Sequence, residues 1–226
     1  MTGFESLYPF LYSGTTDVDA VLDQVSRSTT EKTAEIAQLR ADVLERYRDQ
    51  LIECAGAMAQ SLASGGRLFT FGNGGSSTDA QAVAELFQNP GPGAQPFPAA
   101  ALTTDVAVLT ALSNDVSFDV VYARSLAANG RAGDIALGLS TSGGSENVLR
   151  GFAEATRRGM LTIGLAGYDG GKMAEAGTID YLFVMPSSSV HRIQEAQTTT
   201  YHVLWELTQL ALNTGDVAVP EVGTTR

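Results

Sequence analysis

Residues 134–147 read DIALGLSTSGGSEN, and this stretch decides the fold. Its first part, residues 134–139, is a short apolar run that begins with an acidic residue, a pattern typical of a buried strand in a parallel sheet. A loop of serines, glycines and one threonine follows at residues 140–145. Beyond it, residues 147–158 carry apolar side chains at helical spacing, namely Val148, Leu149, Phe152 and Ala155. The order is therefore strand, hydroxyl-rich loop and helix.

The hydroxyl-rich loop predicts a phosphate-binding site. It offers several hydroxyl groups, together with backbone N–H groups at a helix N-terminus, and both favour a phosphate. Most Ser/Gly loops are plain surface turns. This one, however, follows the carboxyl end of a predicted strand, where the ligands of open α/β sheets bind.

A second stretch has the same order of strand, loop and helix. Residues 67–72 (RLFTFG) predict a strand, residues 73–77 a Gly/Ser loop, and residues 78–88 a helix that Ser77 or Thr78 could cap. The stretch lacks the GxGxxG spacing of dinucleotide-binding folds and the lysine of a P-loop. Two phosphate-competent loops after separate strands favour one ligand in the crevice between them.

The remaining pattern predicts an α/β protein. Further strands are predicted at residues 99–102, 161–167 and 180–185, and a turn at Asn114 and Asp115. Helices are predicted between them, at residues 106–113, 118–128, 172–176 and 192–213. Five strands alternating with helices predict a five-stranded parallel, flavodoxin-like sheet with helices on both faces. The expected strand order is 2-1-3-4-5, with the switch point beside the first strand.

The N-terminal part predicts a long helix and an appendage. Asp17 could cap a helix that runs to Arg27, and residues 28–31 fit a capping box that would start or restart one. Apolar residues then recur three and four apart up to Leu62, which predicts an amphipathic helix about 33 residues long. Such a helix either covers the core or forms an oligomer contact. The expected organisation is an N-terminal arm at residues 1–16, one domain at 17–213 and a frayed tail at 214–226.

Charge and composition exclude several classes of protein. The net charge of −11 argues against binding to a nucleic-acid backbone, so neutral donors would have to hold a phosphate. The single cysteine, Cys54, excludes an internal disulfide. The chain has neither a signal-peptide pattern nor an apolar run near 18 residues. A cytoplasmic protein without membrane contact is therefore expected.

Five stretches in the same order resemble the sugar isomerase (SIS) domain family. They are FGNGGSSTDAQAVAELF, ALTTDVAVLTALSND, GDIALGLSTSGGSENVLRGFAEA, GLAGYDGGKMA and HRIQEAQTTTYHVLWEL. Together they reach from the end of the long helix to the end of the last one. The branch most similar to them contains the bacterial phosphoheptose isomerases and their replication-initiator-associating relatives.

The resemblance implies a homotetramer with its sites near subunit interfaces and a phosphorylated sugar, expected to be a seven-carbon ketose or aldose phosphate, as ligand. It also implies the ligand-binding residues, which are Asn73, Gly74, Gly75, Ser76, Asn114, Asp115, Ser140, Thr141, Ser142, Ser145 and Gln194. Gln194 and His202 match the family's glutamine and histidine on the last helix, and they are the candidate catalytic residues.

The resemblance breaks at the catalytic helix. Active members carry a histidine and a glutamate four residues apart, both able to bind a metal, and the aligned residues here are Ala82 and Leu86. Since positions i and i+4 share a helix face, one whole face has become apolar. Glu85 is one position away, which is about 100° around the helix. Gln194 and His202 alone are too few for a zinc site, so no metal or other cofactor is expected.

Two functions therefore remain open, and a third is a weaker option. Isomerisation of a ketose to an aldose needs a base, and an acid or metal to stabilise the enediolate. The candidates for these roles are His202, Glu195, Glu85 and His191. The first hypothesis is an isomerase acting on sedoheptulose 7-phosphate. The second is a non-catalytic regulatory protein that keeps the sugar-phosphate pocket, and the third is a purely structural adaptor.

Overall fold

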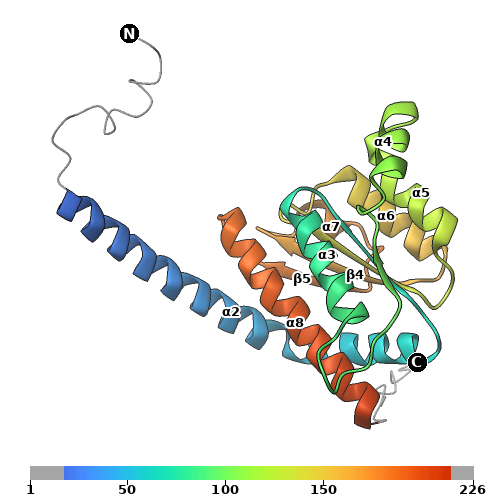
Figure 1. Ribbon diagram of the computed structural model, residues 1–226, viewed down its shortest axis with the longest axis horizontal. Helices are drawn as coiled ribbons and strands as arrows, with labels where there is room; N and C mark the ends of the chain where they lie inside the picture. Colours follow the sequence, from blue (N-terminus) through green and yellow to red (C-terminus); the bar gives the residue numbers. More distant parts are fainter. Residues whose placement is uncertain (1–17, 215–226) are drawn as a thin grey trace, which may run out of the picture. The chain divides into compact units, whose positions relative to one another are not determined.

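The computed structural model describes residues 18–214, drawn in Figure 1 in colours that follow the sequence. The chain divides into two compact units, residues 1–38 and 39–226. The arm expected at residues 1–16, the cap expected at Asp17 and the tail expected beyond residue 214 lie outside the described residues.

Helix α2, Val18–Ala63, is one continuous α-helix of 46 residues with a part in each unit. The helix start predicted at residues 28–31 is therefore wrong. Hydroxyl groups there bond backward along the helix: Thr30 Oγ1 donates to the carbonyl of Ser26 at 3.0 Å, and Thr33 Oγ1 to that of Thr29 at 2.9 Å. A hydroxyl bonded four residues back leaves the helix intact, so these residues do not interrupt it.

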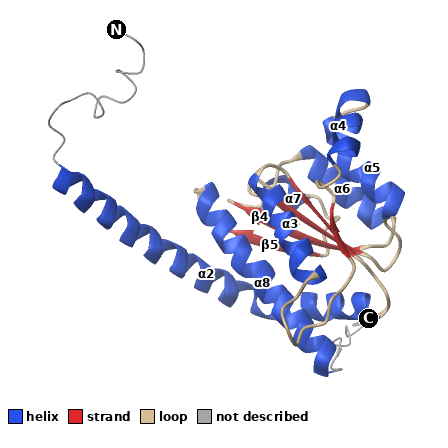
Figure 2. Cartoon of the chain, viewed as in Figure 1, coloured by secondary structure: helices blue, strands red, loops and turns tan. Residues whose placement is uncertain are grey.

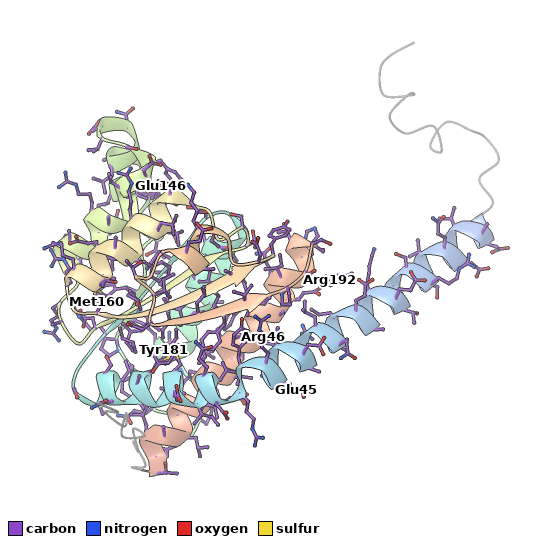
Figure 3. All side chains as sticks on the ribbon, turned by 180° about the vertical axis from the view of Figure 1, so that it is seen from behind. Glu45, Arg46, Glu146, Met160, Tyr181 and Arg192 are labelled. Carbon is purple, nitrogen blue, oxygen red and sulfur yellow. The ribbon has the colours of Figure 1, made fainter. Side chains whose placement is uncertain are left out.

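The sheet has five parallel strands in the order β2-β1-β3-β4-β5, which confirms the predicted flavodoxin-like topology. The strands are β1 Leu68–Gly72, β2 Ala99–Ala101, β3 Ile135–Ser140, β4 Leu161–Gly167 and β5 Tyr181–Met185. In Figure 3, Met160 marks the end at which β4 begins, and Arg192 lies at the opposite end, where the strands finish. The order reverses between β1 and β3, so the crevice of a doubly wound sheet opens at their carboxyl ends.

Helices cover both faces of the sheet (Figure 2). On one face lie η2 Phe118–Val120, α5 Val121–Asn129, α6 Glu146–Arg157 and α7 Gly171–Glu175, with α4 Val106–Asp115 packed on η2 and α5. On the other lie α3 Gly75–Gln88 and α8 Val190–Thr214, which contact each other. The second half of α2 joins this face, because the Tyr47 ring meets that of Phe183 edge-on at 5.4 Å.

The strands bury side chains on both faces. On β1, Phe69 and Phe71 join the core under α5 and α6, whereas Thr70 between them bonds the Ala80 carbonyl of α3 at 2.6 Å. Gly138 of β3 lies under the aromatic rings, because a Cβ there would be 2.7 Å from Phe71 Cε2. This two-sided burial explains why the strands read as apolar runs rather than as alternating patterns.

Several element boundaries differ from the sequence prediction. Helix α3 begins at Gly75 rather than residue 78, and α4 continues through Asn114 and Asp115, which end the helix instead of forming a separate turn. The helix predicted at residues 118–128 begins as a short 3₁₀ turn before α5. Within residues 18–214, no helix is long and apolar enough to cross a bilayer.

Candidate ligand-binding site

The loop after β3 holds three serine hydroxyls in a row. Ser140 Oγ lies 3.0 Å from Ser145 Oγ and 3.5 Å from Ser142 Oγ. Ser140 is buried, whereas Ser142 is exposed at the rim of the loop. The backbone N–H of Gly144 donates to Ser142 Oγ at 3.2 Å and helps to fix this hydroxyl. The serine row therefore joins a buried hydroxyl, that of Ser140, to an exposed one, that of Ser142.

Helix α6 begins without a side-chain cap. Ser145 is its N-cap residue, yet its hydroxyl makes no bond to the first turn and lies beside Ser140 instead. The first N–H groups of a helix have no partner inside it and carry its partial positive charge. The start of α6, flanked by the serine row, is thus suited to an anion.

The loop after β1 forms a matching helix start. Gly74, the N-cap residue of α3, has φ of 56°, in the left-handed region that favours glycine. This sharp turn lets α3 begin at Gly75, so Ser77 and Thr78 lie within the first turn and do not cap the helix. Gly74 and Gly75 are exposed, whereas Ser76 is buried. Because β1 pairs in parallel with β3, the α3 and α6 starts share one edge of the sheet.

Hydrogen bonds join the two loops directly. Asn73 Nδ2 donates to Asn147 Oδ1 at 2.8 Å, and Asn147 Nδ2 donates back to Asn73 Oδ1 at 2.9 Å. The Tyr122 hydroxyl, from α5, donates to the Gly72 carbonyl at 2.5 Å and lies 3.0 Å from Asn73 Oδ1. Asn147 and Tyr122 were not among the residues predicted from the sequence. Asn147 is separated from the serine loop only by Glu146, but nothing in the sequence indicates that its side chain bonds to Asn73.

Helix α8 brings a third group to the start of α3. Gln194 Nε2 donates to Asp79 Oδ2 at 3.1 Å, and the Gln194 amide packs so tightly on Gly75 that a Cβ there would overlap it. At the same place, Ile193 borders the serine loop, because it packs against Gly167 together with the Thr141 carbonyl. The predicted residue Gln194 therefore lies against the start of α3, and its neighbour Ile193 lies against the serine loop.

Asp79, like Asn147 and Tyr122, was not among the residues predicted from the sequence. Burial raises the pKa of Asp79 above its ordinary value, and the hydrogen bond from Gln194 partly opposes that effect. The sequence did contain a signal for Asp79, because its spacing places it on the same helical stripe as Ala82 and Leu86. Asp79 is the polar member of that stripe.

Two aromatic residues of α8, Tyr201 and His202, follow Gln194 along the helix. Tyr201 is buried, and its pKa is raised by burial and, more weakly, by the nearby charge of Asp79. The ring of His202 stacks on that of Tyr201 with centroids 5.1 Å apart, and His202 is exposed. Asp79, Gln194 and Tyr201 thus lie near one another where α3 meets α8, and His202 stacks on Tyr201 at the exposed surface.

The apolar positions on α3 lie as the helical spacing predicts. Ala82 is exposed, Leu86 is half-buried, and α3 is a single α-helix, so Glu85 stays about 100° away from Leu86. The Glu85 carboxylate accepts a bond from Asn89 Nδ2 at 2.9 Å. Together with Ala82, Glu85 lines a separate cavity of about 550 Å³ between α3 and β2.

Other predicted residues lie elsewhere. Asn114 Nδ2 donates to Asp115 Oδ1 at 2.7 Å, and within residues 18–214 neither side chain bonds to the two loops. Glu195 is exposed and pairs with Arg192 at 3.6 Å. His191 is exposed at the start of α8. Their assignment to ligand binding or proton transfer remains a prediction.

The residues on α3 do not fit the zinc site that the family resemblance implies. Ala82 and Leu86 offer no donor atoms, and the Gln194 amide nitrogen bonds Asp79. Among the residues that the structure describes, no group of three His, Cys, Asp or Glu side chains could hold a metal ion. Whether the chain takes up a metal stays a prediction.

The fold and the two loops define an open, doubly wound α/β domain with two uncapped helix starts at the carboxyl ends of β1 and β3. The chain belongs to the SIS domain family, whose model matches residues 33–167. The phosphoheptose isomerase of Aquifex aeolicus is 43% identical over 176 residues, which are 77% of this chain and 91% of that protein. The sequence-based recognition of this family is therefore confirmed.

Solved structures agree with the sequence relatives. The phosphoheptose isomerase of Neisseria gonorrhoeae superposes with a TM-score of 0.75 at 34% identity, covering 81% of this chain and 98% of that one. That of Francisella tularensis also gives a TM-score of 0.75, at 29% identity, covering 87% of this chain and all of the other. The fold of this chain is thus the fold of phosphoheptose isomerases.

Proposed function

We propose that this chain binds a phosphorylated sugar at the carboxyl ends of β1 and β3, with sedoheptulose 7-phosphate as the ligand. One observation carries the proposal: two helices, α3 and α6, begin at this edge without side-chain caps, and the serine row lies beside one of them. The relatives named phosphoheptose isomerase support the choice of sugar.

The phosphate is placed at the loop after β3. Ser142 and Ser145 donate their hydroxyls to its oxygens, and the first N–H groups of α6 add the partial charge of the helix. The chain carries a net charge of −11, so neutral donors are the means by which it would hold an anion. The sugar then extends toward α3 and α8, where Asp79 and Gln194 meet.

The activity we propose first is interconversion of the ketose and the aldose. A base removes a proton from C1, the carbonyl oxygen at C2 gains one, and the resulting enediol returns a proton to C2 while O1 loses its own. Asp79 is the proposed base, because its carboxylate is half-buried beside Gln194 and its pKa is raised. His202 is the proposed group that moves the proton between the oxygens.

A second function is favoured by Ala82 and Leu86. Apolar side chains at the two positions where the family resemblance implies catalytic groups suit a protein that binds the sugar phosphate without converting it. Such a protein would regulate a partner according to the level of the sugar.

Two measurements separate these functions. Calorimetry with sedoheptulose 7-phosphate tests binding, and proton NMR in D₂O follows exchange at C1 and formation of the aldose. Binding with exchange and aldose formation supports the isomerase, and binding without either supports the regulatory protein. No binding at millimolar ligand would overturn the common proposal.

The phosphate contacts have a test of their own. Replacing both Ser142→Ala and Ser145→Ala should weaken binding by about 2 to 4 kcal/mol, because each lost bond to a charged group contributes about 1.5 to 3 kcal/mol and the two losses need not add. Ser113→Ala is the matched control, since among residues 18–214 the Ser113 hydroxyl bonds only the Leu109 carbonyl of its own helix. Unchanged affinity in the double variant would contradict the placement of the phosphate.

We also infer that the chain forms a homotetramer and works in the cytoplasm. Val21, Leu22 and Val25 on α2 are exposed apolar side chains that suit a contact with another copy. Light scattering coupled to size exclusion measures the assembly, and a monomer at micromolar concentration would contradict it. Fractionation of cells tests the location.

A further inference from the structure

The Asn73 side chain is committed to bonds inside the protein. Asn147 Nδ2 donates to Asn73 Oδ1 at 2.9 Å, and Asn73 Nδ2 donates to Asn147 Oδ1 at 2.8 Å. The Tyr122 hydroxyl donates its one proton to the Gly72 carbonyl at 2.5 Å, and its oxygen lies 3.0 Å from Asn73 Oδ1. The side chain of Asn73 therefore joins the loop after β1 to the start of α6.

The three residues come from three different elements. Asn73 follows β1, Asn147 is the second residue of α6, and Tyr122 lies on α5. Asn147 and Tyr122 are 2% and 1% exposed, so their bonds lie in a region of low dielectric where a satisfied polar network is strong. The network thus fixes the distance between the loop after β1 and the start of α6.

We propose that Asn147 and Tyr122 are positioning residues that hold the two ligand-binding loops in register, Asn147 through Asn73 and Tyr122 through the Gly72 carbonyl at the end of β1. This inference rests on the proposed function, because it explains how one sugar phosphate could meet both loops at once. Neither residue contacts the ligand. They lower the cost of ordering the loops when the ligand binds, as a preorganised site does.

The first test is calorimetry of sedoheptulose 7-phosphate with Asn147→Ala. We expect at least a tenfold loss of affinity, because α6 and the Asn73 loop would no longer be held together. Asn129→Ala is the matched control, since its amide is exposed and bonds only the Ser125 carbonyl within α5. Denaturant unfolding of each variant confirms that the measured protein is folded.

A double-mutant cycle distinguishes positioning from a general structural effect. If Asn147 acts through Asn73, the variant with both Asn73→Ala and Asn147→Ala binds no more weakly than Asn147→Ala alone. If Asn73 meets the ligand independently, the two losses multiply, and the proposal is wrong. Tyr122→Phe, which removes one hydroxyl, serves if Asn147→Ala fails to fold, and we expect it to weaken binding severalfold.

The failures of the two proposals can be told apart. If the wild-type chain does not bind the sugar phosphate, the proposed function falls, and this inference falls with it. If the wild type binds but Asn147→Ala and Tyr122→Phe bind equally well, only the positioning role is overturned.

Discussion

At the scale of single residues, the contact between Asp79 and Gln194 changes the view of the chemistry. The sequence suggested a catalytic helix emptied of reactive groups, because Ala82 and Leu86 replace the expected histidine and glutamate. The structure places another carboxylate on the same stripe, one turn before Ala82 and bonded to Gln194. Isomerisation would then have a base from a different position on α3.

Asp79→Asn should abolish turnover while leaving binding of the sugar phosphate nearly unchanged. Loss of a general base lowers the rate by about 10²- to 10⁴-fold, and the amide keeps a group of the same shape beside Gln194. Initial rates by NMR, together with calorimetry, measure the two effects. Glu85→Gln is the matched control on the same helix, and a loss of turnover in that variant alone would reassign the base.

The pH dependence of turnover follows from the same carboxylate. A base acts in its deprotonated form, so the rate should fall as the pH decreases through the pKa of Asp79. Burial raises that pKa, and the fall should therefore begin above the ordinary value of 3.8. A rate that stays constant down to that value would argue against Asp79.

At the scale of elements, α3 offers a test of how the chain aligns with its active relatives. Ala82→His together with Leu86→Glu would place two donors on one face, next to Gln194 and His202 of α8. We expect the double variant to retain about one zinc ion per chain after dialysis, as measured by elemental analysis. Ala82→His alone is the control, and an absence of zinc in the double variant would mean that these positions do not face Gln194.

The opposite end of the sheet is held by a buried ion pair. Asp134, at the entrance to β3, accepts bonds from the Arg67 guanidinium at 2.7 Å and from the backbone N–H groups of Arg67 and Arg131. Burial alone would raise the pKa of Asp134, but the hydrogen bonds from Arg67 outweigh burial and hold it below its ordinary value. The ionised form therefore stabilises the fold.

Asp134→Ala should lower the free energy of unfolding by about 3 kcal/mol or more, because it removes the acceptor of the Arg67 and Arg131 backbone N–H groups and of the Arg67 guanidinium. The Asp134 contribution is present at pH above the ordinary value of 3.8 and is lost as the pH falls through the depressed pKa. Denaturant unfolding should show a smaller difference in the free energy of unfolding between the variant and the wild type at pH 3 and below than at pH 7. Glu146→Gln, which breaks the exposed pair with Arg150, is the control and should leave stability unchanged.

Elements and their order could be predicted from the sequence, whereas contacts between distant elements could not. Short apolar runs followed by Ser/Gly loops indicate parallel strands because both faces of the sheet are buried. Gln194 and Asp79 are 115 residues apart, and Asn147 and Asn73 are 74 apart. Such pairs depend on how each helix is rotated over the sheet. The start of α3 was missed because the Gly74–Gly75 pair permits a positive φ but does not indicate at which residue the helix begins.

At the scale of the whole molecule, the site depends on the centre of the sheet. Strands β1 and β3 pair through five residues each, from Leu68 with Ile135 to Gly72 with Leu139. All the proposed phosphate and positioning groups follow these two strands or pack against them. The α4 helix packs mainly on η2 and α5, and none of its residues is fully buried. Apart from Asn114 and Asp115, whose role in ligand binding stays a prediction, variation there should affect the proposed site least.

The pairing of β1 with β3 has a consequence for the synthesis of the protein. The bond between Asn73 and Asn147 cannot form until the ribosome has passed the start of α6, and parallel pairing across such a separation is slow. A sugar phosphate would therefore stabilise only chains that have already closed the middle of the sheet. Shorter nascent chains would gain nothing from it and would stay open to proteases and chaperones.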